Sequence, residues 1–140
     1  MAQTSRAHNL SMFLVYDSPW VSLADSPDIY RKSPAGFDFI RDVPTHWDET
    51  RFIKGDVDEY IALARRAGRQ WYIGAMNGDV ARRIILPMDF LGNGRWDAEL
   101  WLDGNSPDAI RRESRQVAPG DRLEIDLAAS GGAVIRLGQR

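Results

Sequence analysis

The sequence contains no cysteine, which excludes a disulfide framework, a cysteine-ligated zinc site and a thiol nucleophile. It has only two histidines, His8 and His46, which lie far apart and lack the i, i+4 spacing of a metal-binding pair. We therefore expect packing or surface roles for both. A basic excess is also missing, because the formal net charge is −2 and the scattered cationic residues are almost all arginine. This balance argues against nucleic acid and anionic membranes as partners.

Long hydrophobic runs are missing as well, so no segment has the length of a transmembrane helix. The apolar run from Leu10 to Tyr16 is short and is followed at once by Asp17, Ser18 and Pro19. A signal peptide is the weaker interpretation of this run, because a strongly basic start and a small-residue cleavage site are lacking. We expect a core helix instead, and the composition suits the cytoplasm and the periplasm equally well.

The composition that is present, 44% hydrophobic and 27% charged residues over 140 positions, is typical of one folded domain with a short appendage. The first part of the chain follows an α/β pattern. His8 to Tyr16 predicts a helix, and the nearly continuous apolar run Trp20 to Ala24 predicts a strand that is buried on both faces. Ser33 and Pro34 then predict the start of a second helix, with an inner stripe formed by Phe37, Ile40 and Val43.

From about Trp47 onward the pattern is that of antiparallel β-structure. In the segment Arg95 to Leu102, residues Trp96, Ala98, Leu100 and Leu102 fall on one face, and Arg122 to Leu127 alternates in the same way. Further short strands are predicted at Tyr60–Arg66, Trp71–Met76, Arg83–Met88, Arg112–Val117 and Ala133–Leu137. Turn residues such as Gly92-Asn93-Gly94 separate them. Short strands spaced in this way indicate a β-sandwich.

The alternation also predicts which side chains fill the space between the two sheets. Leu100, Leu123, Ile125, Trp71 and Ile73 are expected in this core. The residues expected in solvent are Glu99, Glu124 and Asp126.

A pair of neighbouring carboxylates, Asp48 and Glu49, is the first candidate for glycoside-cleaving chemistry. Such chemistry needs two carboxyl groups that face each other across a sugar. Neighbours along an extended chain point to opposite sides, so we interpret both residues as closing a turn beneath Trp47. No nucleophile elbow, Walker loop or dinucleotide-binding element is present. We therefore assign no catalytic residue and no metal ligand.

The tryptophans are the other candidates for a binding site. Trp71 and Trp96 lie on the apolar side of their strands and are expected in the core. Trp101 lies on the polar side with Asp97 and Glu99. An outward tryptophan is either a contact for another domain or subunit, which we favour, or a platform for a sugar ring.

One stretch carries a family resemblance. It runs from Val43-Pro44-Thr45-His46-Trp47-Asp48-Glu49-Thr50-Arg51, through the strand Tyr60 to Arg66, to Trp71-Tyr72-Ile73-Gly74-Ala75-Met76-Asn77. This stretch resembles the junction between the catalytic barrel and the C-terminal β-sandwich of glycoside hydrolase family 97, whose members cleave α-glucosides or α-galactosides. The resemblance implies a mainly β chain: residues 1–46 would be the last elements of a TIM barrel (helix, strand, helix), and residues 47–140 an antiparallel β-sandwich.

The same resemblance implies that the chain is the non-catalytic tail of a larger enzyme of carbohydrate metabolism. The family's catalytic carboxylates and calcium-binding glutamates belong to earlier segments, so calcium is implied for a full-length member and no cofactor for this chain. Asp25 would lie at the C-terminal end of the last barrel strand, where it could touch substrate in a full-length enzyme. The family also suggests the bacterial periplasm.

Partners follow from the elements that a complete barrel would supply. Without them the first forty residues would either repack onto the sandwich or drive association into a homo-oligomer, through an interface that includes Trp101, Phe13, Tyr16 and Trp20. The alternative is a free-standing carbohydrate-binding or protein-interaction module.

Overall fold

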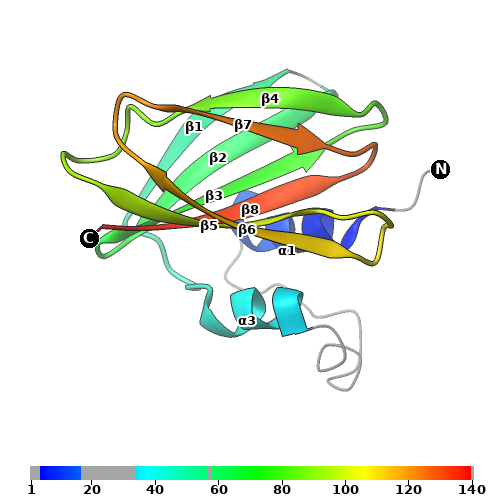
Figure 1. The fold of residues 1–140 in the computed structure, drawn as a ribbon, viewed down its shortest axis with the longest axis horizontal. Helices are drawn as coiled ribbons and strands as arrows, with labels where there is room; N and C mark the ends of the chain where they lie inside the picture. The colour runs from blue at the N-terminus through cyan, green and yellow to red at the C-terminus, as the bar shows by residue number, and fades with distance from the viewer. Residues whose placement is uncertain (1–3, 17–33, 57, 140) are drawn as a thin grey trace.

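The structure is a computed structural model that describes residues 4–16, 34–56 and 58–139. These residues form two helices and eight strands (Figure 1). The helices are α1 (Arg6–Val15) and α3 (Pro34–Asp42). The strands are β1 (Glu49–Asp56), β2 (Tyr60–Ala67), β3 (Gln70–Asn77), β4 (Arg82–Pro87), β5 (Trp96–Asp103), β6 (Ile110–Val117), β7 (Arg122–Leu127) and β8 (Gly132–Gln139).

The strands form two antiparallel sheets. The larger sheet has six strands in the order β1-β2-β3-β8-β5-β6, and the smaller pairs β4 with β7. Figure 1 shows β4 and β7 lying across one face of the larger sheet. Side chains from both sheets pack between them, so the predicted mainly β, antiparallel sandwich is confirmed.

The alternation of β7 illustrates how the sequence builds this core. Leu123 and Ile125 are 4% and 3% exposed, while Glu124 and Asp126 between and beside them are exposed. The tryptophans expected in the core are buried as well. Trp96 donates a hydrogen bond from Nε1 to the carbonyl oxygen of Gly92 at 2.9 Å, which closes the predicted turn before β5.

The two helices lie on the opposite face of the six-stranded sheet. Helix α1 buries Ala7, Leu10, Ser11 and Leu14, and Figure 1 shows α3 on the side away from β4 and β7. The sandwich therefore has a third, helical layer, built from the segment that the resemblance assigns to the end of a barrel.

Two details differ from the sequence prediction, and a few predictions lie outside the described residues. Strand β1 is not among the predicted strands, yet it pairs with β2 along its length around a bulge between Phe52 and Lys54. In α3 the buried aromatic side chain is Phe39, which was not part of the predicted stripe, while Ile40 and Val43 pack as predicted. The predicted strand from Trp20 to Ala24, the residue Asp25, and the side chain of Phe37 lie outside what the structure describes.

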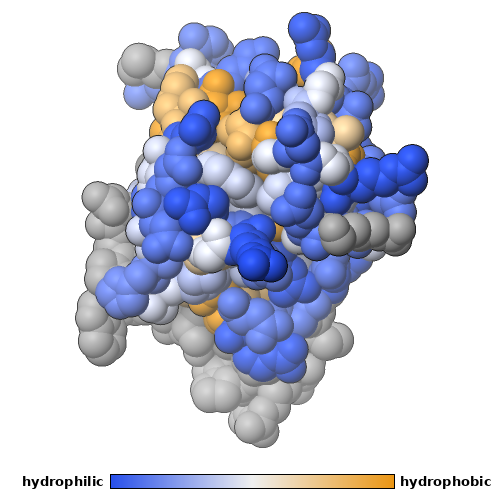
Figure 2. Space-filling view, turned by 90° about the vertical axis from the view of Figure 1, so that its left-hand side faces the viewer, coloured by the Kyte–Doolittle hydropathy of each residue, from blue (hydrophilic) through white to orange (hydrophobic). Residues whose placement is uncertain are grey.

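The surface is largely hydrophilic on the face that Figure 2 shows, with hydrophobic atoms visible mainly toward its upper end. Neither described helix has the length and apolar character needed to cross a membrane.

Candidate functional site

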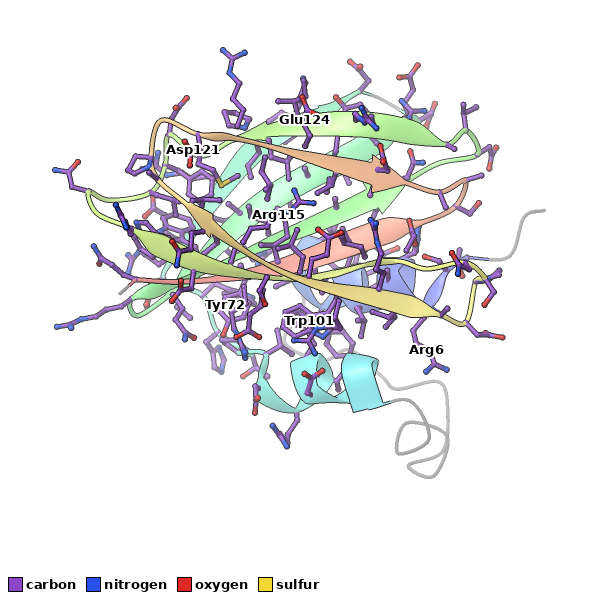
Figure 3. The ribbon with its side chains drawn as sticks, in the orientation of Figure 1. Arg6, Tyr72, Trp101, Arg115, Asp121 and Glu124 are labelled. Carbon is purple, nitrogen blue, oxygen red and sulfur yellow. The ribbon has the colours of Figure 1, made fainter. Side chains whose placement is uncertain are left out.

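The outer face of the six-stranded sheet, turned away from β4 and β7, is where the helices pack. Figure 3 shows Trp101 between the sheet and α3. A second hydrophobic cluster, separate from the core between the sheets, is buried between the helices and this outer face. It contains Leu10 and Leu14 of α1, Phe39 of α3, Tyr72 of β3, Trp101 of β5 and Val134 of β8. This layer joins α1 and α3 to the sandwich through a second hydrophobic core.

Two glycines let α1 lie close to the sheet. A Cβ atom on Gly74 of β3 would stand 2.6 Å from Cβ of Leu14, and one on Gly132 of β8 would stand 2.7 Å from Cα of His8. Real Cβ atoms do not approach other atoms so closely, so any larger residue would push the helix away. An isolated glycine within a strand pattern is a known sign of such a close approach, and this signal could have identified Gly74 from the sequence.

The start of α1 is fixed to the sheet by Ser5 and Asp103. The Ser5 hydroxyl accepts a hydrogen bond from the backbone N–H of His8 at 3.0 Å, which caps the helix. The same hydroxyl donates to Asp103 at 2.5 Å. The Asp103 carboxylate also accepts from the backbone N–H groups of Ala128 at 2.9 Å and Gly132 at 3.1 Å. One carboxylate therefore joins the helix start, the end of β5 and the turn between β7 and β8.

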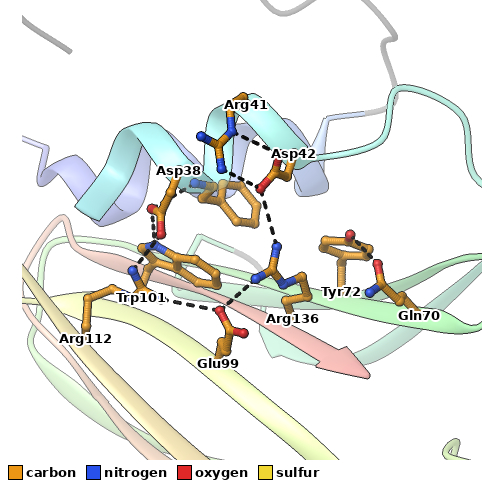
Figure 4. A network of polar contacts seen from close by, with 10 residues as sticks. Asp38, Arg41, Asp42, Gln70, Tyr72, Glu99, Trp101, Arg112 and Arg136 are labelled. Atoms are coloured by element: carbon orange, nitrogen blue, oxygen red, sulfur yellow. Dashed lines mark hydrogen bonds and ion pairs between the residues drawn. The ribbon is translucent and has the colours of Figure 1, made fainter. Parts of the chain in front are cut away.

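Helix α3 is held by a polar network that we call the α3 clamp, formed by Asp38, Glu99, Trp101, Arg112 and Arg136 (Figure 4). Asp38 accepts hydrogen bonds from Nε1 of Trp101 at 3.1 Å and from Arg112 at 2.7 Å. Glu99 accepts from Arg112 at 3.3 Å and from Arg136 at 2.7 Å. The Arg112 guanidinium also lies 4.2 Å from the centroid of the Trp101 ring, a cation–π distance.

Trp101 points away from the inter-sheet core, as predicted, and its contact is helix α3, from the segment that the resemblance assigns to the barrel end. The alternation placed it on the correct face, opposite the inter-sheet core, but its side chain is 0% exposed because α3 covers that face. The Phe39 ring packs edge-on against it at 5.2 Å between centroids. Glu99, also predicted in solvent, is half-buried in the α3 clamp. The indole of Trp101 is therefore not available to a sugar ring or to another subunit.

Two shifted pKa values belong to the same face. The Arg41 guanidinium hydrogen-bonds Asp42 and lowers the pKa of that carboxyl. Burial raises the pKa of Tyr72, whose hydroxyl donates to the side-chain oxygen of Gln70 at 2.9 Å. The nearby Asp42 and Glu99 carboxylates raise the pKa of Tyr72 further, and Arg136 opposes them.

Asp48 and Glu49 do not face each other across a cleft. Asp48 accepts a hydrogen bond from the backbone N–H of Gly68 at 2.8 Å. Glu49 pairs with Arg51 at 2.7 Å and with Arg66 at 3.4 Å, and its hydrogen bond to Arg51 lowers the pKa of Glu49. These contacts tie the chain before β1 to strand β2 and its turn, as the sequence interpretation required.

The two histidines have different surroundings. Nδ1 of His8 lies 2.9 Å from the carbonyl oxygen of Gly131, and His46 is exposed. Among the described residues, no group of three His, Cys, Asp or Glu side chains could bind a metal ion.

The remaining predicted interface residues are divided. Phe13 is half-buried against the second cluster, and Tyr16 is 49% exposed at the end of α1. Trp20 lies outside the described residues.

A groove of about 530 Å³ opens beside Tyr16, between the end of α1 and the β1–β2 hairpin. Its apolar wall includes Val15, Tyr16, Phe52, Ile61 and Met76. Phe52 is 64% exposed and was not recognised from the sequence, because β1 was not predicted as a paired strand.

Comparison with known proteins shows the family to which the chain belongs. The family model described as "Glycosyl-hydrolase 97 C-terminal, oligomerisation" matches residues 46–138. This chain belongs to that family. The resemblance inferred from the residues around Pro44 to Asn77 is therefore confirmed.

Curated and solved relatives extend the match to nearly the whole chain. The "Retaining alpha-galactosidase" of Bacteroides thetaiotaomicron is 34% identical over 98% of this chain and 21% of its own length. A "Probable retaining alpha-galactosidase" of Streptomyces bingchenggensis is 37% identical over 91% of this chain and 20% of its own length. The structure of a glycoside hydrolase family 97 enzyme from Pseudoalteromonas sp. strain K8 superposes with a TM-score of 0.90 at 37% identity, over 96% of this chain and 22% of that chain.

These matches settle two points about the family 97 chain. It spans about a fifth of the length of the relatives it matches, and corresponds to their C-terminal part. A TM-score of 0.90 over nearly the whole chain means that α1 and α3 lie on the sheet here as they do in the Pseudoalteromonas enzyme. The expectation that the first forty residues either repack or drive self-association stays a prediction, since residues 17–33 lie outside the part of the chain that the structure describes.

Proposed function

We propose that this chain is the non-catalytic, assembly-promoting C-terminal part of a family 97 α-glycosidase, with residues 1–46 ending the barrel and residues 47–140 forming the sandwich. The observation that carries the proposal is the fixed helical layer. Gly74 and Gly132 let α1 lie close to the sheet, and the hydrogen bond from Ser5 to Asp103 fixes its start. The α3 clamp holds α3 on the same face. The names of the curated relatives support α-galactosides as the substrate class of the whole enzyme, with α-glucosides as the alternative.

The role of the chain in such an enzyme is mechanical. Helices that are anchored to the sandwich by a second hydrophobic core hold the end of a barrel at a fixed position. The buried Ser5 hydroxyl and the indole N–H of Trp101 both have hydrogen-bond partners in this layer, and leaving such a group without a partner would cost about 1–3 kcal/mol. The layer therefore resists sliding of the helices over the sheet, which is what a structural joint between a barrel and its tail requires.

Substrate and calcium would be bound elsewhere in a longer enzyme. The described residues offer no metal site, so a calcium ion of the full-length enzyme would need ligands from other segments. Asp25, at the predicted end of the last barrel strand, is the position in this chain that could reach a substrate there. The carbohydrate-binding alternative loses its main support, because Trp101 is buried beneath α3.

A hydrolysis assay tests the non-catalytic part of the proposal. The purified chain, with and without calcium, should release no nitrophenol from p-nitrophenyl α-galactoside or α-glucoside, because its candidate carboxylates Asp48 and Glu49 are not arranged as an opposed pair. The Bacteroides relative serves as the positive control. Turnover by the chain that disappears on Asp48→Asn or Glu49→Gln would contradict the proposal.

A further inference from the structure

The two large aromatic side chains that are exposed in the described part of the protein both line the groove beside α1. Among the described residues, four large hydrophobic side chains are exposed: Tyr16 (49%), Phe52 (64%), Val80 (65%) and Ile85 (38%). Tyr16 and Phe52 line the same groove, and the other two do not. Two exposed aromatic side chains gathered in one apolar groove are the kind of surface that marks an interface.

The groove lies on the helix-bearing face of the sheet. Phe52 of β1 is opposite Leu63 of β2, and Leu63 is opposite Gly74, the residue that meets α1. The three residues therefore share one face. Helix α1 covers this face at β3 and β8, and the groove begins where the helix ends, over β1 and β2.

Docking through the edge of the sheet is disfavoured. Strand β1 is an edge strand, but a bulge between Phe52 and Lys54 interrupts its ladder, and the side chains of Arg51, Lys54 and Asp56 are exposed along it. Bulges and charges are the usual protection of a β-edge against pairing. A partner therefore fits the apolar face of the hairpin better than its edge.

The charges of the hairpin point to a second copy of the chain. Its turn end carries Asp56, Asp58 and Glu59. The opposite end carries Arg51, Arg66 and Arg69, which outnumber Asp48 and Glu49. A two-fold axis near Phe52 would run the two hairpins antiparallel and place the acidic end of each over the basic end of the other.

We propose that this groove is where a second copy docks, with Phe52 and Tyr16 of each copy inserted across a two-fold axis. The proposal rests on the assembly role proposed above and names the surface that performs it. The family description, which includes oligomerisation, agrees with a partner of the same kind.

Sedimentation equilibrium of the full chain and matched variants tests the assignment. Phe52→Lys should raise the dimer dissociation constant about tenfold or more, as loss of a central aromatic anchor does. Val80→Lys makes a similar change at a residue of nearly equal exposure outside the groove, and should leave the constant unchanged. Tyr16→Lys provides a second groove variant, and unchanged melting temperatures show that each variant is folded.

A charge exchange tests the antiparallel arrangement. Asp56→Lys and Arg69→Glu should each weaken the dimer, and the double variant should recover most of the loss. A dimer that both groove variants leave intact would overturn the assignment of this surface while the assembly role stands. A chain that is monomeric before any substitution would overturn the assembly role itself.

Discussion

At the scale of single residues, the position of α1 depends on the missing side chain of Gly74. We predict that Gly74→Ala destabilises the protein by about 1–3 kcal/mol, because the new methyl group would stand 2.6 Å from Cβ of Leu14 and must displace the helix. Chemical denaturation monitored by tryptophan fluorescence measures the loss.

Gly138 provides the matched control. It also lies in a strand, but a Cβ atom there would have no neighbour within 4 Å. Gly138→Ala should therefore change the free energy of unfolding by less than about 0.5 kcal/mol. Equal losses at the two glycines would mean that close packing of α1 does not depend on Gly74.

Trp101 shows what alternation can and cannot reveal about one residue. The period of two assigned it correctly to the face opposite the inter-sheet core. Whether that face meets water depends on α3, which is distant in sequence and brings Phe39 and Asp38 over the indole. The helix was predicted with Phe37, Ile40 and Val43 as its inner residues, so nothing in the sequence pattern paired Phe39 with Trp101.

At the scale of elements, the smaller sheet depends on the inward residues of β7. Leu123→Ala or Ile125→Ala should cost about 2–5 kcal/mol, as truncation of buried aliphatic side chains does. Glu124→Ala, on the exposed face of the same strand, should cost less than about 0.5 kcal/mol. Thermal or chemical unfolding of the three variants measures this, and equal losses for Leu123 and Glu124 would contradict the strand's orientation.

Whether a strand was predicted correctly depends on how regularly its own hydrophobic and polar residues alternate. Strand β7 was predicted with its observed bounds, because hydrophobic and charged residues alternate without interruption between two turns. Strand β1 was not predicted because its bulge breaks the alternation and because five of its eight residues are exposed, four of them polar or charged and the fifth the apolar Phe52. Edge strands contribute little burial to the pattern from which strands are recognised.

At the scale of the whole molecule, the sequence predicted the sandwich and the family, but the helical layer required the structure. Helix α1, near the start of the chain, packs on Gly74 of β3 and Gly132 of β8. The α3 clamp joins Asp38 to β5 and β6. Such contacts depend on backbone placement over long separations, which periodicity does not encode. The docking groove was equally hidden, since Tyr16 and Phe52 meet only in the folded chain.

The proposed assembly role requires that the chain associates with itself in solution, and a single measurement can check this. Sedimentation equilibrium of the unmodified chain, over a wide range of concentration, reports its mass in solution. The account predicts a reversible approach to twice 15.8 kDa as the concentration rises, because the groove of each copy is then filled by the other. A mass of 15.8 kDa at every concentration would contradict it.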